Sequence, residues 1–196
     1  MPARFSPQFY LASKSPRRQE LLSQIGLQFS VVSVDVPELH EEGEPAESFV
    51  KRLALDKARA GWALANQPAW PVMGADTIVV VDEHILGKPT DRDDAVAMLA
   101  RLSGREHQVM TAVAMVNSDK SVVILSNNKV TMRETLEAER MAYCATGEAD
   151  DKAGAYAIQG QAAAFISHLD GSYSGVMGLP LYETTKLLED FDIKVF

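Results

Sequence analysis

A run of ten mostly apolar and β-branched residues at 72–81 constrains the fold of this chain more than any other feature. Valine and isoleucine are enriched in strands, so the run is the strongest strand candidate of the sequence. Asp76 interrupts it, and a carboxylate there must be hydrogen-bonded, ion-paired or bound to a metal. This position favours a functional carboxylate over one that only forms structural hydrogen bonds. Gly74 lets another backbone or a ligand approach the same strand closely.

Strand and helix patterns alternate along the rest of the chain, with one hairpin. Further strands are expected at 9–12, 28–34, 108–116, 121–132 and 163–169, and helices at 16–25, 45–65, 90–103, 135–146 and from 178. This order predicts an α/β fold with a mixed central sheet and flanking helices. No internal repeat or low-complexity linker marks a boundary, so we expect one domain over residues 1–196.

Composition excludes several classes of protein. The chain has 196 residues with 46% hydrophobic and 23% charged side chains, as in ordinary globular proteins. Its net charge of −8 argues against a nucleic-acid-binding protein. The single cysteine, Cys144, rules out an intrachain disulfide and is expected to be a small buried hydrophobe. We find no signal peptide or membrane-spanning run and expect a cytoplasmic protein with no membrane partner.

Residues 10–26 read as a strand, a polar loop and a helix, with two cations where acidic residues are preferred. Ser15 is the expected N-cap, its hydroxyl accepting from free N–H groups, and Pro16 suits the first helical position. Arg17 and Arg18 in the first turn are unfavourable unless an anion lies beside them. Free N–H groups, hydroxyls and guanidinium groups together predict a phosphate site. The alternative is two solvated arginines.

Two further charged side chains occupy notable positions. Lys57 lies on the apolar stripe of the expected helix at 45–65, eight residues after Phe49. Its ammonium group either reaches water along its own stem or points into a cleft. Glu38 follows a strand end within the acidic segment 35–47, most of which we expect to be a solvated loop.

The segment 151–160 combines small residues with a few polar ones. It is either a loop that only reverses the chain or one whose backbone closes over a ligand. Lys88 lies at the start of another expected helix. His107 is isolated in the sequence, and we interpret it as structural.

Together and in this order, these segments resemble the Maf family of nucleoside triphosphate pyrophosphatases. The resemblance covers about residues 9–191 and rests on the segments 11–18, 52–54 with Lys57, 74–77, 87–89, 151–156, 158–160 and 178–180. It implies an elongated, two-lobed Maf/ITPase-like fold with a cleft, a divalent metal and a homodimer. It also implies cleavage between the α- and β-phosphates of a nucleoside triphosphate, giving a monophosphate and pyrophosphate.

The resemblance assigns Asp76 as the base that activates water. Glu38 and Asp76 are the expected metal contacts, and hard oxygen ligands suit magnesium or manganese. A triphosphate needs several cations to offset its charge. The expected substrate contacts are Ser13, Ser15, Arg17, Arg18, Lys57, Lys88 and Lys152.

Three residues indicate the branch of the family that prefers dTTP and UTP. Pro16 is followed directly by Arg17, without the aromatic residue that a sister branch inserts, and Thr77 and Gln159 also match the dTTP/UTP branch. A glutamine side chain can donate to O4 and accept from N3–H of uracil or thymine. We therefore assign Arg17, Thr77 and Gln159 to specificity. Modified pyrimidine nucleotides stay open as further substrates.

A non-catalytic nucleotide-binding regulator of septum formation or cell division is the alternative function. It would use the same cations but would need no base. Asp76 within an apolar strand favours the enzyme.

Overall fold

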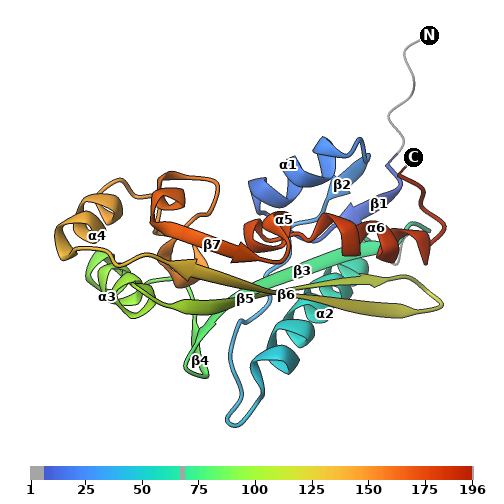
Figure 1. The fold of residues 1–196 in the computed structure, drawn as a ribbon. Coiled ribbons are helices and arrows are strands. Elements are labelled where there is room, and N and C mark those ends of the chain that lie inside the picture. The colour runs from blue at the N-terminus through green and yellow to red at the C-terminus, as the bar shows by residue number, and fades with distance from the viewer. Residues whose placement is uncertain (1–6, 67–68, 196) are drawn as a thin grey trace. The chain divides into compact units, whose positions relative to one another are not determined.

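The computed structural model describes residues 7–66 and 69–195, which form a mixed α/β fold (Figure 1). Among these residues, seven strands form one sheet in the order β2-β1-β3-β5-β6-β7, and β4 pairs with β3. The strands are β1 (Phe9–Leu11), β2 (Phe29–Val31), β3 (Val72–Val81), β4 (His84–Leu86), β5 (Glu106–Val116), β6 (Ser121–Met132) and β7 (Ile166–Asp170). The sheet is mixed because β1 runs parallel to β2 and β3, whereas β4 is antiparallel to β3 and β7 to β6. The predicted fold class is confirmed.

Six α-helices and two short 3₁₀ helices complete the described part of the chain. They are α1 (Pro16–Gln24), α2 (Ala46–Leu64), α3 (Arg92–Leu102), α4 (Glu137–Cys144), α5 (Tyr173–Met177) and α6 (Leu181–Glu189), with η1 (Ala153–Ala155) and η2 (Gln161–Phe165). No helix among the described residues is long and apolar enough to span a bilayer.

The chain divides into two compact units, which we describe separately. The first unit comprises residues 1–76, 111–126 and 178–196, and the second comprises residues 77–110 and 127–177. Residues 1–6, 67–68 and 196 lie outside the described part of the chain. The expectation of one domain over residues 1–196 stays a prediction.

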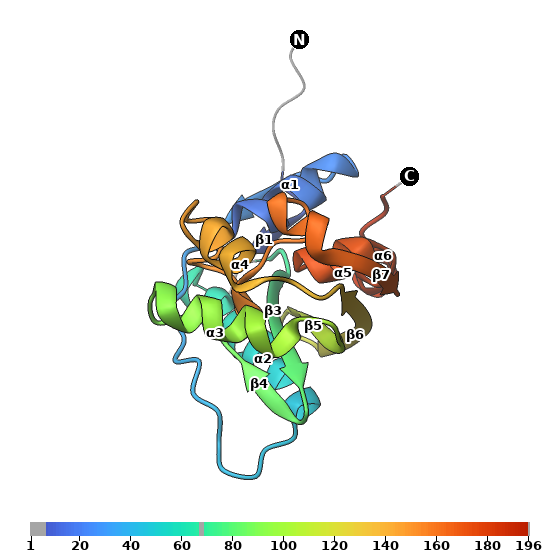
Figure 2. The ribbon, with the colours of Figure 1, turned by 60° about the vertical axis from the view of Figure 1, so that its left-hand side comes forward.

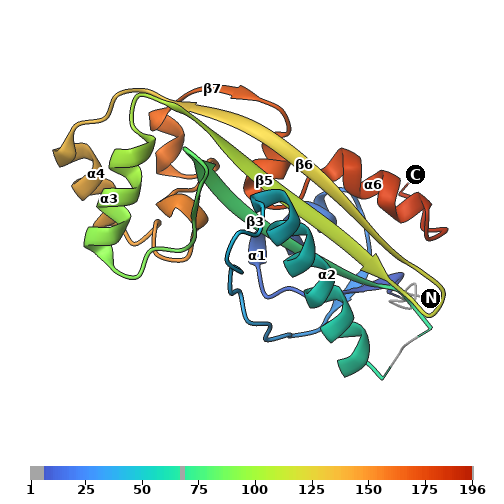
Figure 3. The ribbon, with the colours of Figure 1, turned by 90° about the horizontal axis from the view of Figure 1, so that it is seen from below.

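In the first unit, α2 packs directly on the sheet because two glycines leave room for it. A Cβ atom at Gly61 would lie 2.8 Å from Ala12 Cβ and 2.9 Å from Val72 Cγ1. A Cβ atom at Gly74 would collide with the backbone of Ala54 and Ala58. Figures 1 and 3 show α2 on one side of the sheet and α1 and α6 on the other. The close approach of α2 to β3 fixes the positions of the polar side chains between them.

The second unit has its own apolar core around α3 and α4, which lie side by side in Figures 1 and 2. Val79, Leu99, Val130 and Phe165 are buried there, as is Cys144, in accordance with the sequence prediction. Burial of each large apolar side chain contributes about 1.5–3 kcal/mol to stability.

The segment 161–170 differs from its prediction. A strand was expected at 163–169, but residues 161–165 form η2, in which the N–H of Ala163 donates to Gly160 O at 3.1 Å. The strand begins only at Ile166, where it pairs with Met132 of β6. The apolar pattern predicted a strand here but not the local hydrogen bonds that wind residues 161–165 into η2.

Candidate active site

Three charged side chains meet on one face of α2 in the first unit. Lys57 Nζ donates to Asp76 Oδ1 at 2.6 Å and to Glu38 Oε1 at 2.5 Å. Asp76 comes from β3 and Glu38 from the segment between β2 and α2. Lys57 and Asp76 are only 9% and 6% exposed. The lysine therefore binds two carboxylates, and the interpretation that its ammonium group reaches water along its stem is wrong.

The electrostatic surroundings of Asp76 are unusual for a carboxylate. Burial raises the pKa of Asp76 above its ordinary value, and the positive charges of Lys57 and Arg18 partly oppose that shift. A raised pKa makes the carboxylate a better proton acceptor when it is ionised. Asp76 is thus a buried carboxylate with a raised pKa, held in place by its bond to Lys57.

Arg18 ties the start of α1 to the segment that precedes α6. Its Nε donates to Gly178 O at 2.8 Å, and its NH1 donates to Ser13 Oγ at 3.3 Å. Ser13 Oγ also accepts from the N–H of Ser15 at 3.2 Å. Three of the predicted phosphate contacts therefore lie together at the beginning of α1.

The predicted side-chain cap of α1 is wrong. Ser15 occupies the N-cap position with an extended backbone, but its hydroxyl forms no capping hydrogen bond. The N–H of Ser15 itself donates to the hydroxyl of Ser13, two residues before it. The first turn of α1 contains no acidic residue, so Arg17 and Arg18 add to the positive end of the helix dipole. This charge distribution is suited to an anion.

The remaining predicted site residues belong to the second unit. Thr77 follows Asp76 in β3 and is half-buried, and Lys88 is exposed between β4 and α3. Lys152 is ion-paired with Asp151. Gln159 is exposed, and its side chain forms no hydrogen bond with any described residue.

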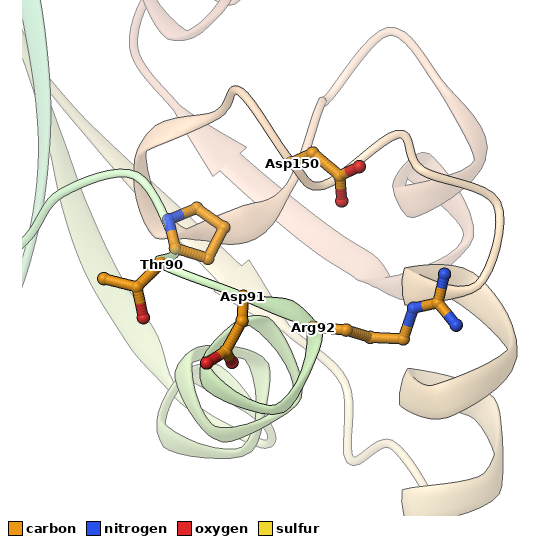
Figure 4. A pocket seen from close by; sticks show the side chains of 5 residues that line it. Thr90, Asp91, Arg92 and Asp150 are labelled. Atoms are coloured by element: carbon orange, nitrogen blue, oxygen red, sulfur yellow. The ribbon is translucent and has the colours of Figure 1, made fainter.

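A separate polar hollow lies beside the start of α3 (Figure 4). Its lining residues are Pro89, Thr90, Asp91, Arg92 and Asp150. Asp91 is engaged as the N-cap of α3, accepting from the N–H of Asp94 at 2.8 Å. The hollow contains none of the predicted substrate contacts, and we assign it no function.

Glu38 and Asp76, the predicted metal ligands, have side chains that are chemically suited to a divalent metal. Both offer hard carboxylate oxygens, and both lie within 2.6 Å of one cationic atom, Lys57 Nζ. No group of three or more histidine, cysteine, aspartate or glutamate side chains suited to a metal occurs among the described residues. A magnesium ion held by these two carboxylates would take its other ligands from phosphate and water.

Two groups of contacts in the second unit go beyond what the sequence pattern predicted. His107 was predicted to be structural, and its Nε2 lies 2.7 Å from the hydroxyl of buried Tyr156. Burial lowers the pKa of His107 to about 4. Tyr143 and Glu148, which contact each other and the segment 157–161, were missed because no short-range pattern links them.

Comparison with known proteins gives a consistent result over nearly the whole chain. Residues 8–191 match the model of the Maf family, described as "Maf-like protein". A protein of Saccharophagus degradans named dTTP/UTP pyrophosphatase is 53% identical, covering 97% of this chain and 92% of its own length. Proteins with the same name from Alkalilimnicola ehrlichii and Xanthomonas oryzae pv. oryzae are 52% and 54% identical, covering 98% and 93% of this chain and 97% of their own lengths. The chain therefore belongs to the Maf family.

Proposed function

We propose that this protein is a nucleoside triphosphate pyrophosphatase that hydrolyses dTTP and UTP to the monophosphate and pyrophosphate. The observation that carries the proposal is Asp76, a buried carboxylate on an apolar strand, held at 2.6 Å by Lys57. Membership of the Maf family and relatives named dTTP/UTP pyrophosphatase support the same reaction.

In the proposed mechanism, Asp76 accepts a proton from the attacking water. The oxygen of that water bonds to phosphorus, the bridging P–O bond between the α- and β-phosphates breaks, and pyrophosphate leaves. Lys57 orients the carboxylate through its bond to Oδ1. Arg17 and Arg18 at the positive end of α1, with Ser13 and Ser15, offset the charge of the phosphate oxygens. Lys88 and Lys152 are proposed as further phosphate contacts.

A divalent metal, magnesium or manganese, would be held by Glu38 and Asp76 and would offset charge on the triphosphate. Lys57 binds only one of the two oxygens of Asp76, so the carboxylate retains an oxygen for a second role. Lys57 bridges the two acids through its Nζ. A homodimer in the cytoplasm stays part of the proposal.

Base choice is assigned to Arg17, Thr77 and Gln159. The exposed amide of Gln159 makes no side-chain hydrogen bond with the described residues, which leaves it available for a base. Its NH₂ group can donate to O4, and its oxygen can accept from N3–H, of uracil or thymine. The flipped amide would match cytosine equally well, so selectivity requires that the loop fix how the amide is presented.

The test is pyrophosphate release from a panel of purified nucleoside triphosphates, with and without a chelator. We expect turnover of dTTP and UTP above CTP and the purine triphosphates, loss of activity in excess chelator, and recovery with magnesium or manganese. Binding of nucleotide without any hydrolysis would instead support the regulatory function. Unchanged turnover in excess chelator would contradict the metal requirement alone.

A further inference from the structure

We propose that Glu148 is a positioning residue for base selection, which fixes the loop at residues 157–161 so that Gln159 meets the base in one orientation. The inference extends the proposed function and rests on its assignment of Gln159 to the base. Every contact that carries it lies within the second unit.

The carboxylate of Glu148 holds the loop at its far end and, through Tyr143, at its near end. Oε2 of Glu148 accepts from the N–H of Gln161 at 3.1 Å. Oε1 accepts from the hydroxyl of Tyr143 at 2.9 Å, and that hydroxyl accepts from the N–H of Ala157 at 3.3 Å. The two backbone N–H groups lie on either side of Gln159, two residues away in each direction.

Gly160 brings the backbone of the loop against the same carboxylate. A Cβ atom at this position would collide with both carboxylate oxygens of Glu148. The N–H of Gly160 donates to Ala157 O at 3.1 Å, which closes a tight turn around Gln159. A side chain at residue 160 would therefore displace the carboxylate of Glu148 from its position against the loop.

Tyr143 gives the arrangement a rigid base. It is 4% exposed, and its ring packs edge-on against Phe165 with ring centroids 5.6 Å apart. Burial and the neighbouring Glu148 raise the pKa of its phenol, so the hydroxyl keeps its proton and donates to Glu148. The loop is thus attached to the core of the second unit through a neutral donor.

The chemistry of this arrangement requires a carboxylate and not merely a polar side chain. Both oxygens of Glu148 accept from donors, one from a hydroxyl and one from a backbone N–H. A glutamine of the same shape has one oxygen and one NH₂ group, so it can satisfy only one of these donors. Glu148→Gln therefore removes the negative charge and one of the two acceptor oxygens that hold Tyr143 and the N–H of Gln161, while nearly preserving the volume of the side chain.

The experiment compares the parent with Glu148→Gln and Glu148→Asp, using Glu137→Gln as the matched control. Glu137 is an exposed glutamate on α4. We measure the ratio of kcat/KM for UTP to that for CTP, together with amide hydrogen exchange of residues 157–161. We expect Glu148→Gln to lower this ratio about tenfold and to reduce kcat for UTP by a smaller factor. Amide exchange at residues 157 and 161 should become faster. Glu148→Asp retains two acceptor oxygens and should partly restore the ratio, and Glu137→Gln should match the parent.

A selective parent whose ratio and amide exchange are unchanged in Glu148→Gln would overturn the role of Glu148 alone. A parent that hydrolyses no triphosphate, or that shows no preference for UTP over CTP, would contradict the proposed function itself. If Glu148→Gln fails to fold, Glu148→Asp decides between the outcomes. The proposal requires that its UTP-to-CTP ratio be lower than that of the parent but still above one. An unchanged ratio would overturn the proposal.

Discussion

The two units each hold one carboxylate between segments of the chain, but with different partners. In the first unit, buried Asp76 is bound by an ammonium group that also binds a second carboxylate, Glu38. In the second unit, half-buried Glu148 accepts only from neutral donors, a phenol and a backbone N–H. The carboxylate of the first unit joins segments that are distant in the sequence, and that of the second unit joins α4 to the loop at 157–161. They differ in whether opposite charges compensate each other.

This difference indicates what each arrangement is suited to do. Removing two charges from water costs as much as their attraction returns, so a buried ion pair is weak evidence for stability. The Lys57–Asp76 pair is better explained as a site whose charges meet a charged substrate. Glu148 keeps part of its contact with water, and its carboxylate accepts from a phenol and a backbone N–H, which fixes the loop at 157–161.

The largest effect is expected from Asp76→Asn. The amide keeps the shape of the side chain but cannot take a proton from water, so hydrolysis of dTTP and UTP should fall about 10²–10⁴-fold. Nucleotide binding and the unfolding transition should persist. Initial rates, a binding titration and a thermal melt check this expectation, and nearly full activity would remove Asp76 from the role of base.

A smaller loss of about 10²-fold is expected from Lys57→Met, which keeps an apolar stem but removes the charge between Glu38 and Asp76. Lys51→Met is the matched control, because Lys51 lies on the same helix with a half-exposed side chain that pairs with Glu47. The measurement is kcat/KM for UTP in both variants. Equal activity of the two variants would show that the buried cation has no part in catalysis.

The pH dependence of stability tests the other unit through His107. Its folded pKa of about 4 lies below the ordinary value of 6.5, so the unfolded chain takes up a proton first as the pH falls. The stability it contributes is complete above pH 6.5 and is lost towards pH 4, by about 2 kcal/mol between pH 7 and pH 5. His107→Gln should lose correspondingly less free energy of unfolding over this interval. Denaturant titrations at the two pH values measure the difference, and parallel losses in parent and variant would exclude His107 as the cause.

Much of the local structure could be predicted from the sequence because it is encoded in short-range patterns. The apolar run at 72–81 forms β3, and the helical stripe around Phe49 and Lys57 forms α2 within one residue of its predicted bounds. Residues 117–120 form the predicted hairpin turn, with the N–H of Asn117 donating to Lys120 O at 3.0 Å. Asp76 was identifiable because a carboxylate in an apolar strand requires a partner.

The partners themselves were decided by tertiary structure. Lys57 lies nineteen residues from both Glu38 and Asp76, and only the packing of α2 on Gly74 brings the three together. At the start of α1, Ser13 Oγ accepts from the N–H of Ser15, and the Ser15 hydroxyl forms no capping bond, an outcome set by the geometry of the loop. The sequence by itself determined which residues needed partners, since burial of a polar group follows from the apolar pattern around it. Which partner each received, including the contact of Glu148 with the loop at 157–161, depended on distances that exist only once the sheet and helices have packed.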